Sequence, residues 1–78
     1  MANNLYTNLI ATVSPYIGQE KAVGAIGRQL LRCRATPETV TVEDLRGIFH
    51  FVVGATTLYL APDRVKQQAL IEKLKSLV

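Results

Sequence analysis

A long uncharged part of this chain lies between Arg46 and Asp63, and residues 46–62 read RGIFHFVVGATTLYLAP. Such a segment crosses a membrane, lines a site, or fills a core that a domain shares with a partner. It is shorter than the about 20 apolar residues that a bilayer span needs, and it includes a histidine and a glycine. The composition therefore favours a buried helix of a globular domain over a membrane anchor at residues 47–61.

The chain has 78 residues, which is enough for a single domain, 1–78, with one core. Its hydrophobic fraction of 49% and charged fraction of 19% are typical of a globular protein and not of a disordered one. A domain of this size buries only about 60–65% of its unfolded surface, and self-association is the usual way to cover apolar surface that is left over. The N-terminus lacks the basic region of a secretory signal, so we expect a cytoplasmic location.

Apolar residues at helical spacing predict an all-α fold, a compact four-helix domain with short connections. Pro15 is expected to end or kink the first helix, because its ring removes a backbone donor. Thr41 stands three residues before Asp44, a variant capping box that starts the third helix. The predicted helices span approximately residues 3–14, 19–33, 42–60 and 63–77.

The third predicted helix is apolar on nearly every side, which is typical of a central helix covered by its neighbours. A β-hairpin is the alternative, because FHFVV and TTLYL are rich in β-branched and aromatic residues on either side of Gly54. The capping signal at Thr41 favours the helix. Its main apolar stripe is expected to comprise Leu45, Ile48, Val52, Ala55 and Tyr59.

Two glycines, Gly24 and Gly27, lie inside the second predicted helix, where each costs about 1 kcal/mol relative to alanine. Two interpretations are open: a close helix–helix crossing that needs the missing side chains, or a weak helix with no special role. The high apolar content at short length favours a dimer with twofold symmetry. The residues expected to form contact surfaces are Gly24, Gly27, Phe51, Leu58 and Tyr59.

The sequence contains no constellation of residues that indicates catalysis, metal binding or cofactor binding. His50 is the only histidine, and we expect it to be a partly buried structural residue. Cys33 is the only cysteine, which excludes an internal disulfide, and without a neighbouring base it is expected to be a small buried or edge residue. The chain is therefore predicted to be no enzyme and to use no cofactor or metal ion.

Arginines gather at the end of the second predicted helix, where Arg28 and Arg32 are one turn apart and Arg34 follows. A net charge of +3 permits a weak attraction to polyanions. The same arginines also suit helix-end carbonyls or ion pairs with Glu38 and Glu43. An anion-binding cluster of Arg28, Arg32 and Arg34 makes a small basic nucleic-acid-binding protein the alternative function.

Residues 13–33, VSPYIGQEKAVGAIGRQLLRC, resemble a small helical accessory domain of bacterial signalling proteins, where it is appended to serine/threonine kinases, cyclases or receiver-containing chains. The shared features are Tyr16-Ile17-Gly18 and an apolar-patterned helix that ends in arginines, and EDLRGIF at 43–49 is similar to the opening of that domain's next helix. Proline and small apolar residues commonly follow the glycine in that family, whereas this chain has Gln19-Glu20. The resemblance covers about half of the chain and implies an interaction or regulatory role.

These observations together predict a small non-catalytic protein-interaction or regulatory module that self-associates. The expected partner is another protein, first of all a second copy of the chain in a homodimer. Nucleic acid is the less favoured partner, and no membrane partner is expected.

Overall fold

The computed structural model describes residues 2–78 and contains helices and turns but no strand within that range. The α-helices are α1 (Asn4–Ile17), α2 (Gln19–Leu30), α3 (Val42–Gly47), α4 (Phe49–Thr57) and α5 (Arg64–Lys75), and the short 3-10 helices are η1 (Leu31–Cys33) and η2 (Leu58–Leu60). The predicted all-α domain is confirmed, and the β-hairpin alternative is wrong.

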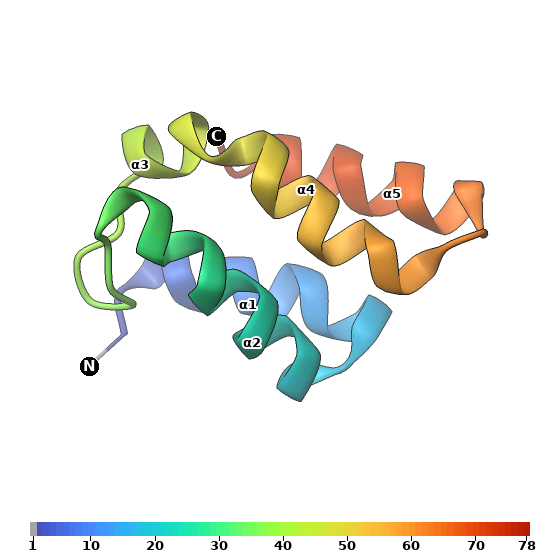
Figure 1. The fold of residues 1–78 in the computed structure, drawn as a ribbon, viewed down its shortest axis with the longest axis horizontal. Helices are drawn as coiled ribbons and strands as arrows, with labels where there is room; N and C mark the ends of the chain where they lie inside the picture. The colour runs from blue at the N-terminus through green and yellow to red at the C-terminus, as the bar shows by residue number, and fades with distance from the viewer. Residues whose placement is uncertain (1) are drawn as a thin grey trace.

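The four longer helices form an antiparallel bundle (Figure 1). Helix α1 packs on α2 and α5, and α4 packs on the same two helices, so the order around the bundle is α1, α2, α4, α5. The segment from η1 to α3 crosses one end of this bundle, where both chain termini also lie (Figure 1). There the N–H of Asn3 donates to the Pro37 carbonyl at 2.9 Å, and Arg46 donates to the Val78 carbonyl at 3.2 Å.

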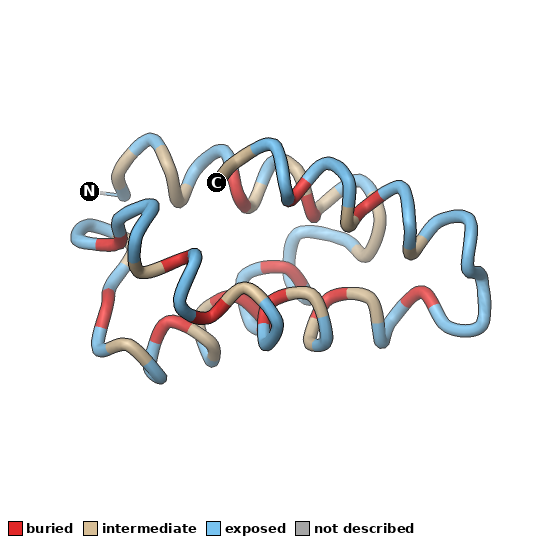
Figure 2. Tube along the Cα trace, turned by 90° about the horizontal axis from the view of Figure 1, so that it is seen from above, coloured by how far each residue is buried: buried red, intermediate tan, exposed pale blue. Residues whose placement is uncertain are grey.

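The core is made of aliphatic side chains that recur on the facing sides of the helices (Figure 2). Their spacing of four residues in α1, α2 and α5 matches the amphipathic pattern of the sequence. Burial of this apolar surface, at about 25 cal/mol per Å², is the main stabilising contribution to the fold. The core residues are Leu9, Val13, Ala22, Ile26, Leu30, Ala35, Val40, Leu45, Ile48, Val52, Leu60, Leu70 and Leu74.

The first helix is longer than the sequence predicts, because Pro15 lies inside α1 and does not end it. The hydrogen bond that the proline removes would have reached the carbonyl of Ala11, an exposed residue at which water can take over. The last turn is closed by the N–H of Gly18, which donates to the Ser14 carbonyl at 2.8 Å. Gly18, with φ of 90°, is therefore the residue that stops the helix.

The prediction of a single helix over 42–60 is wrong, because α3, α4 and η2 replace it. Ile48 separates α3 from α4 with φ of −112° and ψ of 11°, outside the α-helical region. Gly47 immediately before it costs about 1 kcal/mol relative to alanine in a helix interior, which lowers the cost of ending α3 here. The chain changes direction here so that α3 covers the end of the bundle (Figure 1).

Helices α3 and α5 begin at side-chain caps that their sequences indicate. Thr41 Oγ1 accepts from the Asp44 N–H, and the Asp44 carboxylate accepts from the Thr41 N–H, each at 3.1 Å. Asp63 caps α5 by accepting from the Lys66 N–H at 3.0 Å. The predicted capping box is confirmed, and such a cap contributes about 1 kcal/mol to helix stability.

Helix α4 is covered on one side only and is not the central helix that its apolar sequence predicts. The buried positions are Val52 and Thr56, followed by Leu60 in η2, whereas Ala55 of the expected stripe is half-buried and Tyr59 is 42% exposed. The Thr56 hydroxyl donates to the Val52 carbonyl at 2.8 Å, which removes the cost of burying it. A threonine whose hydroxyl is satisfied within its own helix therefore occupies a core position.

The chain leaves η1 through Arg34, which adopts a left-handed conformation with φ of 56°. Its N–H donates to the Leu31 carbonyl at 3.3 Å, and the Ala35 N–H donates to the Leu30 carbonyl at 3.0 Å. These paired bonds form a Schellman motif, in which glycine is the usual residue at the left-handed position. Arg34 therefore carries a steric cost that glycine would not.

Replacing this residue, Arg34→Gly, is expected to raise the free energy of unfolding by about 0.5–1 kcal/mol, after allowance for the greater freedom of glycine in the unfolded chain. Urea unfolding followed by circular dichroism measures the change. Arg34→Ala is the matched control, because it removes the same charge but keeps the Cβ atom. An equal gain from alanine would contradict the backbone explanation.

Candidate functional site

One side of the molecule combines basic and aromatic side chains from α2, α4 and η2. Gly24 and Arg28 lie along one side of α2, and Arg32, four residues further on, lies in η1, which follows α2 directly. Phe51 and Leu58 are about two helical turns apart, so they lie on the same side of the α4–η2 segment. We name this surface the basic-aromatic face, and it comprises Lys21, Gly24, Arg28, Arg32, Phe51, Leu58 and Tyr59.

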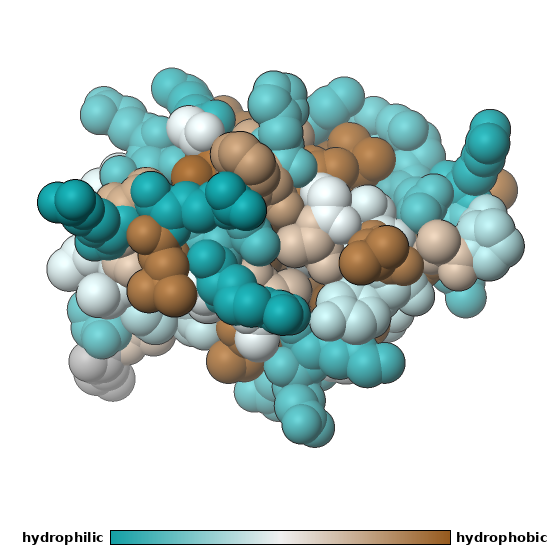
Figure 3. Space-filling model, in the orientation of Figure 1, coloured by the Kyte–Doolittle hydropathy of each residue, from teal (hydrophilic) through white to brown (hydrophobic). Residues whose placement is uncertain are grey.

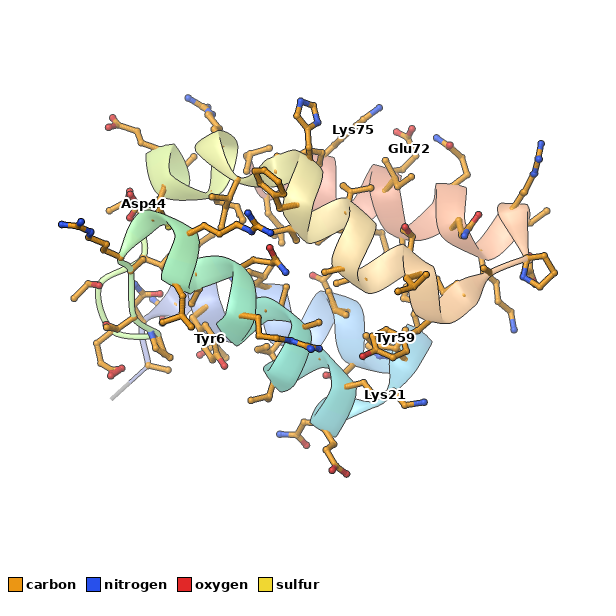
Figure 4. All side chains as sticks on the ribbon, in the orientation of Figure 1. Tyr6, Lys21, Asp44, Tyr59, Glu72 and Lys75 are labelled. Carbon is orange, nitrogen blue, oxygen red and sulfur yellow. The ribbon has the colours of Figure 1, made fainter. Side chains whose placement is uncertain are left out.

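Two cation–π contacts join the two halves of the basic-aromatic face. The guanidinium carbon of Arg32 lies 4.0 Å from the centroid of the Phe51 ring, and the Nζ atom of Lys21 lies 5.3 Å from that of Tyr59. Figure 4 shows Lys21 and Tyr59 side by side, one from each half of the face. Contacts of this kind contribute about 0.5–1 kcal/mol each at exposed sites and hold the long basic side chains in place.

The apolar members of this face are open to solvent. Phe51 is 48% exposed, Leu58 71% and Tyr59 42%. In Figure 3 hydrophobic surface is visible between hydrophilic groups on the side that α2 and α4 form. The sequence placed these three residues on a contact surface and the arginines on a separate anion site, whereas the structure brings both groups together.

The cations of this face have few carboxylates near them. The sequence has no acidic residue from Lys21 to Arg34, and Glu20 stands at the N-terminal end of α2. Over residues 2–78 the one ion pair is that between Glu72 and Lys75 on α5, at 3.6 Å. The basic charge of the face is therefore largely unneutralised.

The arginines bond to their own helix and not to the carboxylates of the following turn. Arg28 Nε donates to the Gly24 carbonyl at 3.3 Å, and Arg32 Nε donates to Gln29 Oε1 at 2.8 Å. Arg34 lies beyond η1 in the turn and is not part of the face. Lys21 takes its place, a residue that sequence reasoning missed although it is seven positions, two helical turns, before Arg28.

A second surface lies between α1 and α2, where an open groove has a volume of about 430 Å³. None of its lining residues is charged. The hydroxyls of Thr7 and Ser14 donate to carbonyls within α1, at 3.1 and 2.7 Å, so their polar groups are already satisfied. Sequence reasoning missed this groove because it arises only where α1 packs on α2. We name it the uncharged groove, and it is lined by Ala2, Tyr6, Thr7, Ile10, Ala11, Ser14, Gln19 and Val23.

The two glycines of α2 have no close neighbour among residues 2–78, because a Cβ atom added to either would meet nothing there within 4 Å. Gly24 lies on the basic-aromatic face. Gly27 lies beside the uncharged groove, midway between Val23 and Leu31 at intervals of four residues. A close helix crossing at either glycine would therefore involve a second molecule.

The remaining candidates of the sequence analysis lie apart from both surfaces. The expectation that His50 is partly buried is wrong: His50 is exposed, because α4 is covered on one side only. Cys33 is half-buried, as expected, with its Sγ atom 3.4 Å from the Leu30 carbonyl oxygen.

In the part of the chain that the structure describes, no three His, Cys, Asp or Glu side chains gather as a metal site would require. Among those same residues, no helix has the length and apolar character to span a bilayer.

Comparisons with protein-family models, with curated proteins and with solved structures find no match to this chain. The resemblance of residues 13–33 to a helical accessory domain therefore stays a prediction that rests on the residues quoted for it. The function is inferred below from the chemistry of the two surfaces.

Proposed function

We propose that this chain is a small non-catalytic, cytoplasmic protein-interaction module that works as a homodimer, with the uncharged groove at the dimer contact. The observation that carries the proposal is the groove itself, about 430 Å³ in volume and without a charged lining residue. Among its lining residues, Tyr6 and Ile10 are half-buried and Val23 is 43% exposed. Covering these side chains in a dimer would bury apolar surface that a single copy leaves in water.

The lack of charge suits contact with an identical copy. In a dimer with twofold symmetry the same patch meets itself, so a patch that carries charges of one sign only brings like charges together. The uncharged groove avoids that repulsion. The basic-aromatic face does not, because Lys21, Arg28 and Arg32 would approach the same cations of the partner.

The glycine beside the groove supports the same contact. Gly27 costs about 1 kcal/mol in a helix interior, and no neighbour within the chain requires its missing side chain. A second copy that approaches α2 closely would require it. The interaction or regulatory role implied by the resemblance to signalling domains agrees with a module of this kind.

The proposal is tested by a charge placed in the groove, Ala11→Arg. Wild-type chain at micromolar concentration is expected to elute as a species of twice the 8.6 kDa chain mass, and the variant as a monomer. Gel filtration coupled to light scattering measures both masses. An arginine is expected to prevent dimerisation because it would have to be buried against its own symmetry mate.

The matched control is Ala69→Arg, an exposed alanine on α5, a helix that does not pack on α2. This variant is expected to stay dimeric. A wild-type chain that is strictly monomeric at micromolar concentration would overturn the proposal. Dissociation of the dimer to the same extent by Ala11→Arg and Ala69→Arg would also overturn it.

A further inference from the structure

We propose that the basic-aromatic face binds an acidic amphipathic helix of a different protein. This inference deepens the proposed function, on which it rests, because it names the class of partner that the interaction module takes. The partner is identified by charge complementarity: the face offers an apolar centre with cations beside it and few carboxylates. A helix with leucine-like residues on one side and glutamates along its edges matches both properties.

The apolar part of the match is provided by Leu58, which is 71% exposed, with Phe51 and Tyr59 on the same side of the chain. Exposed side chains of this size gain free energy when a partner removes them from water, at about 25 cal/mol per Å². Aromatic residues and arginines are also the residue types that dominate binding energy at protein interfaces. The face therefore contains the residue types that a docking surface needs.

The charged part of the match is partly ordered before binding. Arg32 is stacked on Phe51 at 4.0 Å and donates through Nε to Gln29, so its side chain loses less freedom when a carboxylate binds. Arg28 is held by its bond to the Gly24 carbonyl, without an ion pair to a carboxylate in residues 2–78. Guanidinium groups keep several donors after one is used, and carboxylates are their best partners.

Two other kinds of partner, a second copy of the chain and nucleic acid, fit this face less well. A second copy would bring Lys21, Arg28 and Arg32 against a surface of the same charge. Nucleic acid binds through dense basic clusters and through stacking of bases on free aromatic rings. Here the rings of Phe51 and Tyr59 already have a cation over one side, and Arg34 lies apart from the face.

The test uses a fluorescent peptide of about 18 residues, five helical turns, with leucines at helical spacing and glutamates elsewhere. A second peptide replaces every glutamate with lysine. Binding to the full chain is followed by fluorescence anisotropy at about 0.02 M and about 0.3 M salt. We expect the acidic peptide to bind, more weakly at the higher salt concentration, and the basic peptide not to bind.

Two variants separate the charged from the apolar contribution. Arg28→Glu is expected to weaken binding of the acidic peptide by about tenfold or more, since it opposes a carboxylate with a carboxylate. Leu58→Ser leaves the charge unchanged and is expected to weaken binding by about tenfold, since it removes the apolar contact. Arg28→Glu is also expected to improve binding of the basic peptide. Lys75→Glu, on α5 away from the face (Figure 4), and Ala69→Glu are the matched controls and are expected to bind as the wild type does.

Three results would overturn the inference: no binding of the acidic peptide at low salt, equal binding of both peptides, or binding that Leu58→Ser leaves unchanged. In the last case charge alone would explain binding. Binding of a single-stranded oligonucleotide would then be measured, and tighter binding than that of the peptide would assign the face to nucleic acid. Light scattering on the same samples keeps the two proposals apart. A dimer that does not bind the acidic peptide refutes this inference alone, and a monomer that binds it refutes the homodimer alone.

Discussion

Ile26→Ala is expected to lower the free energy of unfolding by about 3–4 kcal/mol, the largest effect of any substitution considered for this chain. Ile26 is fully buried on α2, the helix that packs on both α1 and α4. Its replacement removes the burial of several methyl and methylene groups and leaves a cavity that rigid neighbours only partly fill. A domain of this length has a total stability of only about 4–12 kcal/mol, so most of the margin would be lost.

The measurement is thermal unfolding at one fixed protein concentration, because dimerisation would make the midpoint depend on concentration. A fall of about 12 °C or more in Tm is expected for a domain of this size. Val65→Ala on α5 is the control, since Val65 is 80% exposed, and its effect should stay within about 0.5 kcal/mol. A loss below about 1 kcal/mol for Ile26→Ala would contradict the closed core described above.

Asn3→Ala is expected to have the second largest effect, a loss of about 2 kcal/mol. Asn3 Oδ1 accepts from the Tyr6 N–H at 2.9 Å and so caps α1. Its Nδ2 group donates to the Val40 carbonyl at 2.8 Å, which attaches the start of α1 to the turn before α3. Removal of the cap costs about 1 kcal/mol, and the loss of a partner for a partly buried carbonyl costs about the same again.

Asn3→Asp separates these two contributions, because a carboxylate keeps the cap but has no N–H for the Val40 carbonyl. We expect the order of stability to be wild type, then aspartate, then alanine. Urea unfolding gives the order, and hydrogen exchange at the Tyr6 amide reports whether the cap is kept. An aspartate variant as stable as the wild type would show that the bond between Asn3 and Val40 contributes nothing.

Much of the helical architecture follows from local chemistry and was predictable for that reason. The spacing of Leu9 and Val13 in α1, and of Leu70 and Leu74 in α5, makes each helix bury one side wherever it packs. The capping box at Thr41 acts within a single turn. Features of this kind depend on residues a few positions apart, so the sequence contains all the information they need.

The errors in the predicted fold occur where distant contacts change a local preference. Pro15 is tolerated inside α1 because the bond that it removes lies on the exposed side of the helix. The chain bends at Ile48 because α3 has to cover the end of the bundle, where Gly47 makes the bend inexpensive. His50 is exposed for the related reason that α4 packs on one side only. None of these outcomes is determined within one helical turn.

The candidate site was likewise predictable only in its local features. The sequence identified Phe51, Leu58 and Tyr59 as exposed contact residues and Arg28 and Arg32 as a basic pair, because each group has helical spacing of its own. It did not show that the two groups form one surface. That juxtaposition depends on α2 packing beside α4, a contact between residues about 20–40 positions apart, and so does the partner proposed for it.

The sequence by itself determined that this protein is all-α, where three of its helices begin, and which side of most helices enters the core, because these properties depend on side-chain spacing and capping over a few residues. The tertiary structure alone decided which surfaces remain open. The packing of α1 on α2 creates the uncharged groove, and the packing of α2 beside α4 brings cations onto aromatic rings. The physical reason is that solvent exposure depends on all the neighbours of a residue in space, and only the folded chain brings those neighbours together.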